Sequence, residues 1–311
     1  MEEPTTTEAY TYPDKPTIDE ADSSSMWKSF GSVVLFIVAY YMFFDKDINH
    51  ILVLVLVLFI HELGHFLAMK YFNYTDVKMF FIPLLGALVS GNKEDISQRQ
   101  KAIILLAGPV PGIIIGLVLY YIGFINTQQS LMSAANIFIF LNIFNLLPFK
   151  PLDGGNLIGV LFFDKKETIQ LIFGIVSACV FGAVAIYSES YILIIVPGLL
   201  ITGIIQKYES KRIKEYLRND KIDYNKPFDD LTNEEYWKIR DHVVYNVAGF
   251  SRINAKEYVV SKREKQIIDY IKSLVEKSPT YDLSVLAKIL FLLTWILFLF
   301  GPIIILALIV R

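Results

Sequence analysis

Three ionisable side chains interrupt the most apolar stretch of the sequence. Residues 52–60 are apolar without exception, and the motif H-E-L-G-H follows directly at 61–65. On a helix, His61 and His65 are four residues apart and project from one face, so both imidazoles can reach one zinc ion. Glu62 is offset by about 100° and can act as a general base toward a water molecule at the metal. The alternative is a set of buried polar residues that hydrogen-bond to neighbouring helices.

A catalytic zinc ion needs a third protein ligand, and Asp153 is the best candidate. It lies in the run 145–156, which follows an apolar stretch and contains two prolines and two adjacent glycines. Non-helical backbone of this kind is tolerated at membrane depth only where it lines a protein cavity. Asn145, at the start of the run, could then hold a carbonyl group or the substrate backbone. The alternative is an ordinary turn in which Asp153 caps the next helix. The other histidines, His50 and His242, are expected to be solvated.

The composition is that of a multi-span membrane protein. Hydrophobic residues make up 54% of the 311-residue chain, charged residues make up 19%, and the mean hydropathy is +0.47. The net charge of −2 provides no basic field for a nucleic-acid backbone, so we expect no nucleic-acid partner. The single cysteine, Cys179, rules out an intramolecular disulfide framework.

Apolar stretches of about 20 residues predict the fold class. We expect an all-α polytopic membrane protein with about six to seven transmembrane helices, a membrane-dipping loop and a small helical cytosolic segment. The candidate spans are 27–44, 50–72, 102–124, 131–149, 168–187, 191–206 and 286–310. The predicted domains are a disordered acidic tail at 1–26, a catalytic membrane domain at 27–206 with its core at about 50–160, a cytosolic helical segment at 207–285 and a C-terminal transmembrane helix at 286–311.

Lysine and arginine collect in alternate loops, and this bias predicts the orientation. The loops after the second, fourth and sixth candidate spans are basic, whereas the intervening loops contain one basic residue, Lys46. We therefore expect the N-terminus, the basic loops and residues 207–285 to lie in the cytosol. The H-E-L-G-H motif and Asp153 should then both lie toward the cytosolic face.

Two segments outside the spans have their own patterns. Residues 77–91 are apolar but too short to cross, and Pro83 and Gly86 break them, which favours a membrane-dipping loop or hairpin. In the charged segment, Thr232 and Glu235 predict a capping box. A second helix at 262–277 should present an apolar face, so the segment reads as a small helical domain whose partner is unknown.

Several short motifs together resemble the site-2 protease family of intramembrane zinc metalloproteases. The resemblance covers about residues 51–158, and two further features, Ala107-Gly108-Pro109 and the loop ending in Gly86, look like those of the family. The motifs that carry it are H-E-L-G-H at 61–65, Asn145-x-x-Pro148 and Leu152-Asp153-Gly154. Many members carry a PDZ or CBS domain, and no pattern here indicates either one.

The resemblance implies a three-helix catalytic core with one zinc ion per chain. His61, His65 and Asp153 would hold the metal and Glu62 would be the base. Asn145 and Gly86 would orient the substrate, a membrane protein whose transmembrane segment unwinds into the site within the lipid bilayer.

We therefore expect a zinc metalloendopeptidase that acts in regulated intramembrane proteolysis. A membrane transporter or metal-handling protein, in which the same side chains form an ion path, is one alternative. A catalytically inactive scaffold is another. Metal content distinguishes a scaffold from a metalloprotein, and peptide cleavage distinguishes a protease from a carrier.

Overall fold

The computed structural model divides the chain into two compact units. It describes residues 12–17, 25–43, 47–82, 86–93, 95–163, 166–189, 194–250, 253, 258–275 and 280–309. The membrane unit comprises residues 22–204 and 279–311, and the helical unit comprises residues 1–21 and 205–278. Each unit is described by itself below.

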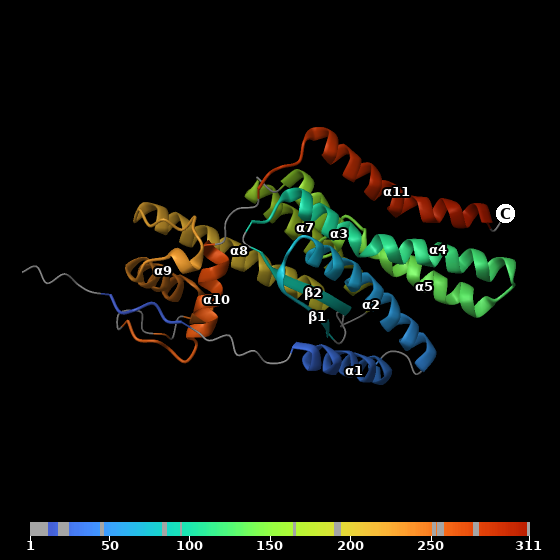
Figure 1. The fold of residues 1–311 in the computed structure, drawn as a ribbon, viewed down its shortest axis with the longest axis horizontal. Helices are drawn as coiled ribbons and strands as arrows, with labels where there is room; N and C mark the ends of the chain where they lie inside the picture. The colour runs from blue at the N-terminus through green and yellow to red at the C-terminus, as the bar shows by residue number, and fades with distance from the viewer. Residues whose placement is uncertain are drawn as a thin grey trace, which may run out of the picture. The chain divides into compact units, whose positions relative to one another are not determined.

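The membrane unit is built almost entirely from helices, which confirms the predicted all-α class (Figure 1). Its one sheet in the described residues is a two-stranded hairpin. Its elements are α1 (Ser25–Phe43), α2 (Ile48–Tyr71), β1 (Thr75–Ile82), β2 (Gly86–Asn92), α3 (Gln98–Ala107), α4 (Pro109–Ile125), α5 (Gln129–Asn145), α6 (Asp153–Ile158), the π-helical turn η1 (Gly159–Phe163), α7 (Glu167–Tyr187), the start of α8 (Ile195–Asn219), and α11 (Val285–Ile309).

Four helical stretches among the described residues are long and apolar enough to cross a membrane. They are Ile48–Tyr71, Gln98–Ile125, Thr168–Tyr187 and Val285–Ile309, and Ser29–Met42 is a shorter apolar helix. The protein is therefore an integral membrane protein.

Two of the expected spans end at residues other than those predicted. Residues 191–193 of the expected span 191–206 lie outside the described residues, and the rest of it is the start of α8, which continues to Asn219 through a charged sequence. That helix is not among the stretches apolar enough to cross. The expected span 131–149 ends early, because α5 stops at Asn145 before Pro148 and Pro151.

Local sequence explains where the helices that carry the site begin and end. Asp47 caps α2 by accepting a hydrogen bond from the backbone N–H of Asn49, and Ser97 caps α3 in the same way through Gln100. The expected span 102–124 is divided at Gly108, where α3 ends and Pro109 begins α4. Proline is well suited to the first position of a helix because the N–H it lacks has no partner there.

The segment expected as a membrane-dipping loop or hairpin is an antiparallel hairpin. Strands β1 and β2 pair in a register that sets Met79 opposite Val89 and Ile82 opposite Gly86. Gly86 has a φ of +106°, a conformation that favours glycine, and this explains the residue type at the start of β2. Residues 83–85 lie outside the described residues.

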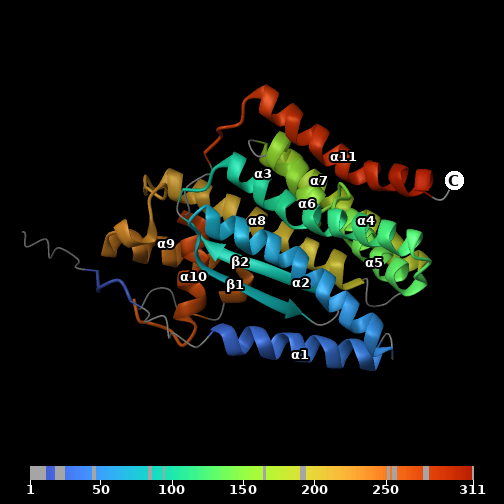
Figure 2. The same ribbon diagram turned by 45° about the vertical axis from the view of Figure 1, so that its right-hand side comes forward.

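Helix α2 is the central element of the membrane unit. It packs against the hairpin on one side and against α3, α4 and α5 on the other, while α1 covers β1 (Figure 2). A buried apolar cluster continues from α3 and α4 through α6 and η1 to Trp295 and Leu299 of α11. Two of the residues that could hold a metal, His61 and His65, therefore lie on a helix that has neighbours on both sides.

The helical unit has its own core. Its elements are the rest of α8, η3 (Phe228–Asp230), α9 (Asn233–Asn246), η4 (Ala248–Phe250) and α10 (Glu264–Val275). The predicted capping box of Thr232 and Glu235 is present at the start of α9. Ile267, Ile271 and Leu274 are buried on the predicted apolar face of α10.

A buried ion pair joins α9 to α10 in the helical unit. The Arg240 side chain is fully buried, and its Nε donates to Glu264 Oε1 over 2.6 Å, as does the Tyr236 hydroxyl over 2.7 Å. Burial alone would raise the pKa of Glu264, but the hydrogen bonds from Arg240, the Ser261 N–H and Tyr236, with the charge of Arg240, hold that pKa below its usual value.

Part of the expected disordered tail is ordered on the helical unit. The Lys15 amine donates to the backbone carbonyls of Phe228, Asp229 and Leu231. The carbonyl of Pro13 accepts a hydrogen bond from the Trp237 indole over 2.7 Å. The expectation of disorder is therefore wrong for residues 12–17, because their lysine and carbonyl groups find partners that the local sequence does not reveal. The other residues of 1–24 lie outside the described residues.

Candidate metal centre

The structure brings His61, His65 and Asp153 together around one point. His61 Nε2 lies 3.1 Å from His65 Nε2, and Asp153 Oδ2 lies 3.1 Å from the first and 3.2 Å from the second. Both histidines lie on α2 and Asp153 is the first residue of α6, 88 positions from His65 in the sequence. The histidines are 4% and 8% exposed, so the cluster is shielded from solvent.

Asn142 of α5 fixes the orientation of the His61 ring. Its amide nitrogen donates to the carbonyl of Phe138 over 2.7 Å, so its oxygen faces His61 Nδ1 at 2.8 Å. An amide oxygen can only accept, so Nδ1 carries the hydrogen and a neutral His61 presents a lone pair at Nε2. A Cβ at Gly112 of α4 would overlap the Asn142 amide, so this glycine makes room for it.

A backbone carbonyl fixes the second ring in the same way. His65 Nδ1 lies 2.8 Å from the carbonyl oxygen of Ile104 on α3, so His65 also presents its lone pair at Nε2. Close packing makes this contact possible. A Cβ at Gly108 would overlap the His65 imidazole, and a Cβ at Gly64 would overlap the backbone of Ala107.

The loop between α5 and α6 carries Asp153 to the histidines. It folds tightly on itself, since a Cβ at Gly154 or Gly155 would overlap backbone atoms of residues 146–150 in the loop. Helix α11 also holds the loop, because the indole N–H of Trp295 donates to the Leu146 carbonyl over 2.8 Å. The two adjacent glycines in the sequence are therefore explained by close backbone approach.

The chemistry of these donors fits a metal cation. Two imidazole lone pairs and one carboxylate oxygen converge, and like electron pairs repel unless a positive charge lies between them. Tetrahedral ligands about 2.0–2.1 Å from zinc are about 3.3 Å apart, close to the 3.1 and 3.2 Å separations observed here. Among the described residues, these three form the group of His, Cys, Asp or Glu side chains able to hold a metal ion.

Glu62 lies beside this cluster and is only 6% exposed. Its carboxylate interacts electrostatically with all three candidate ligands, and the backbone N–H of Val89 in β2 donates to it. A carboxylate at this position is close to the candidate metal without being one of the three converging ligands. The hairpin thus reaches the same site from the other side of α2.

Two residues predicted to orient the substrate are not part of the cluster. The Asn145 amide donates to the carbonyl of Leu141, one turn back on its own helix, over 3.2 Å. Gly86 lies at the start of β2, three residues from Val89. The polar residue of α5 that contacts the cluster is Asn142, which sequence reasoning missed. Its signal was an amide three residues before Asn145 in an otherwise apolar stretch.

A helical membrane protein with a buried His-His-Asp cluster next to a glutamate matches the class of membrane metalloproteases. Residues 49–136 match the model of Peptidase family M50. This match and the relatives described next confirm the predicted resemblance to the site-2 protease family.

Two curated proteins are similar to part of the chain. Stage IV sporulation protein FB of Bacillus subtilis (strain 168) is 26% identical over 146 residues, which are 44% of this chain and 50% of that protein. A zinc metalloprotease of Methanocaldococcus jannaschii is 26% identical over 172 residues, 52% of this chain and 50% of that protein. The chain thus spans about half the length of the curated relatives it matches. A solved structure, the site-2 protease from Methanocaldococcus jannaschii, aligns with 58% of this chain and 88% of its own, at 23% identity and a TM-score of 0.42.

Proposed function

We propose that this protein is a zinc metalloendopeptidase that hydrolyses peptide bonds in the transmembrane segments of membrane proteins, in regulated intramembrane proteolysis. The observation that carries the proposal is the convergence of the lone pairs of His61 and His65 with the Asp153 carboxylate. A relative named as a zinc metalloprotease supports zinc as the metal.

Each residue has a distinct role in the proposed reaction. His61, His65 and Asp153 hold one zinc ion per chain, and Asn142 and the Ile104 carbonyl keep the two imidazoles in their binding tautomers. When bound, zinc supplies a Lewis acid for the scissile carbonyl and lowers the pKa of water.

Glu62 transfers the proton in this scheme. It takes a proton from the attacking water and returns it to the amine that leaves, so the peptide C–N bond is broken without a covalent enzyme intermediate. Its burial and its position beside all three candidate ligands support this role.

The substrate segment binds in an extended form along β2. The Val89 N–H faces Glu62, and backbone groups two residues apart on a strand point to the same side. Gly91 and Ala87 therefore direct their backbone groups toward the side of the site as well. An unwound transmembrane segment can pair with this edge, which begins at Gly86, through main-chain hydrogen bonds. Asn145 of α5 is the second residue proposed to orient the substrate.

We place the active site toward the cytosolic face, with the N-terminus and residues 207–285 in the cytosol. The lysine and arginine bias of the loops supports this orientation. A reporter that works only in the cytosol should be active when fused after Lys93 or Lys211 and inactive after Asn126. The opposite pattern would overturn the placement.

The test of the function is to measure zinc content and cleavage on the same purified variants in detergent. The probes are quenched fluorescent peptides, each an apolar segment with a central helix-breaking Asn-Pro pair. Glu62→Gln should retain about one zinc per chain, because Glu62 is not a ligand, while cleavage falls by about 10²-fold or more. Glu215→Gln, at an exposed position of α8, is the matched control and should cleave like the wild type.

Three results would contradict the proposal. Wild-type protein that binds zinc but cleaves none of the peptides would favour a metal carrier. Wild-type protein without bound zinc would favour a scaffold. Undiminished cleavage by Glu62→Gln would mean that another residue is the base.

A further inference from the structure

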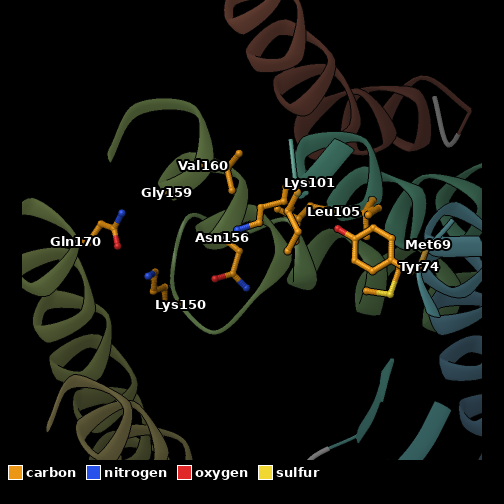
Figure 3. Close-up of a pocket in the computed structure, with 11 residues that line it drawn as sticks. Met69, Tyr74, Lys101, Leu105, Lys150, Asn156, Gly159, Val160 and Gln170 are labelled. Carbon is orange, nitrogen blue, oxygen red and sulfur yellow. The ribbon is translucent and has the colours of Figure 1, made fainter. Parts of the chain in front are cut away.

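A cavity of about 400 Å³ lies beside the metal centre (Figure 3). Its walls come from the end of α2, from α3, from the loop before α6, from α6 and η1, and from the start of α7. It is separate from the point where the candidate metal ligands converge, because none of those ligands lines it. The proposed reaction assigns it no role.

The same elements build this cavity and the metal centre. Ile104 lines the cavity, and its carbonyl holds His65. Met69, one turn after His65 on α2, forms another part of the wall. Asn156, one turn after Asp153 on α6, forms a third. Two residues that line the cavity therefore each lie one helical turn after a candidate metal ligand.

The polar lining of the cavity is cationic and amide-bearing. Lys101 and Lys150 contribute amines, and Asn156 and Gln170 contribute amides. Figure 3 shows the Lys101 side chain extending from α3 toward Asn156. Among the described residues, no carboxylate lines the cavity and Lys101 has no ion pair. Both lysines are half-buried, so an anion placed between them would be partly shielded from water.

We propose that this cavity binds an acidic side chain of the substrate, at a fixed number of residues from the scissile bond. This specificity site rests on the proposed protease function. The carboxylate of an aspartate or glutamate would accept a hydrogen bond from the Lys101 amine, while the apolar wall of Ile104 and Met69 packs against the stem of its side chain.

The position of the cavity favours a polypeptide over a lipid headgroup as the occupant. Its walls include Ile104, whose carbonyl holds His65, and the turns of α2 and α6 that follow His65 and Asp153, so a polypeptide bound at the metal centre lies next to it. The amide nitrogen of Asn156 donates to the carbonyl of Pro151, and its amide oxygen can accept a hydrogen bond from a peptide N–H group.

The test is a charge-swap experiment on purified full-length protein in detergent. Each probe is a quenched apolar peptide in which one position at a time is Glu, Gln or Lys, and the readout is the ratio of kcat/KM between the Glu and Gln versions. For the wild type we expect Glu to be preferred by about tenfold at one position only, the size of one charge-assisted hydrogen bond. Lys101→Gln should abolish this ratio, and Lys101→Glu should instead favour the Lys peptide at the same position.

Two controls separate this proposal from the proposed function. Zinc content should be unchanged in both Lys101 variants, because Lys101 is not a ligand. Lys70→Gln, at an exposed lysine near the end of α2 that does not line the cavity, should keep the wild-type ratio.

Each other outcome would refute either the specificity site or the proposed function. Cleavage without a Glu preference at any position, or a preference that Lys101→Glu leaves in place, would refute the specificity site and leave the protease intact. Cleavage can also be compared in vesicles with and without phosphatidylglycerol. If the only effect of Lys101→Gln is that cleavage no longer responds to this lipid, the cavity binds a lipid headgroup instead. If zinc-loaded wild type cleaves no peptide, the proposed function is refuted. The specificity site is then tested by binding, with fluorescence anisotropy on Glu62→Gln, and equal binding of the Glu and Gln peptides would refute it as well.

Discussion

Replacing Asn142 with alanine tests how the metal centre is held. Asn142 is fully buried, with its oxygen 2.8 Å from His61 Nδ1 and its nitrogen 2.7 Å from the Phe138 carbonyl. In the alanine variant, the Nδ1–H of His61 loses its acceptor. The ring is then free to move its hydrogen to Nε2, the atom that faces His65 and Asp153.

The expected magnitude follows from this contact. A buried donor left without a partner costs about 1–3 kcal/mol, which corresponds to about 5- to 150-fold in an equilibrium constant at 25 °C. Loss of the outer partner of a metal-bound histidine typically lowers metal affinity by about 10- to 100-fold. We therefore expect the Kd for zinc to rise by about 10- to 100-fold in Asn142→Ala.

The assay is a zinc titration in detergent against a competing chromophoric chelator. Asn145→Ala is the matched control, since its amide donates to the carbonyl of Leu141 on the same helix and does not contact either histidine among the described residues. Its zinc Kd should stay within about twofold of the wild-type value. If Asn145→Ala lowers the affinity and Asn142→Ala leaves it unchanged, the reasoning about the His61 tautomer is refuted.

Three further predictions concern stability. Gly108→Ala places a methyl group against the His65 imidazole, so thermal melting should show a loss of about 1–3 kcal/mol and metal analysis a lower zinc content. Trp295→Phe removes the indole donor to the loop before α6, and melting should show a loss of about 0.5–1.5 kcal/mol. The folded-state pKa of Glu264 lies below its ordinary 4.5, so its stabilisation is complete above about pH 4.5 and is lost as the pH falls through the folded-state value. Glu264→Gln should remove this acid sensitivity in melting experiments and, by leaving the Arg240 charge buried, cost about 3–5 kcal/mol near neutral pH.

Each of these predictions has a clear opposing result. Gly182 has open space around its Cα, so Gly182→Ala should melt no lower than wild type, and an equal loss in both glycine variants would mean that the His65 contact is irrelevant. Unchanged melting of Trp295→Phe would show that the indole bond does not hold the loop. A stability that rises as the pH is lowered below 4.5 would reverse the sign assigned to Glu264.

The three candidate ligands that converge in the structure were predictable from local patterns in the sequence. Two histidines four residues apart on a helix must share a face, and Asp153 lies in a Pro- and Gly-rich run that cannot continue a helix. The same reasoning could not find Asn142, because its partner His61 is 81 positions away and only the packing of α5 on α2 brings them together.

Hydropathy predicted the helical membrane fold but not where every helix begins and ends. The stretch 102–124 is apolar enough to read as one span, yet Gly108 and Pro109 divide it into two helices whose junction receives His65. Helix α8 continues to Asn219, beyond the expected end of its span at residue 206. Hydropathy could not predict this, because a helix can continue from an apolar into a charged sequence without any local signal. Residues 12–17 were misjudged since their partners lie more than 200 positions away.

The attachment of residues 12–17 sets an order of events during synthesis. The Lys15 backbone N–H bonds to the side chain of Asn233, 218 positions later in the chain. At about 5–20 residues per second, the ribosome needs about 10–45 s to make the residues between them. During that interval α9, which carries Asn233, has not been made, so residues 12–17 cannot bind to it. Helices α1 to α7 are made in the same interval and can enter the membrane. The helical unit can therefore close around its N-terminal segment only after most of the membrane helices have been made, and α11 follows as the last helix of the described chain.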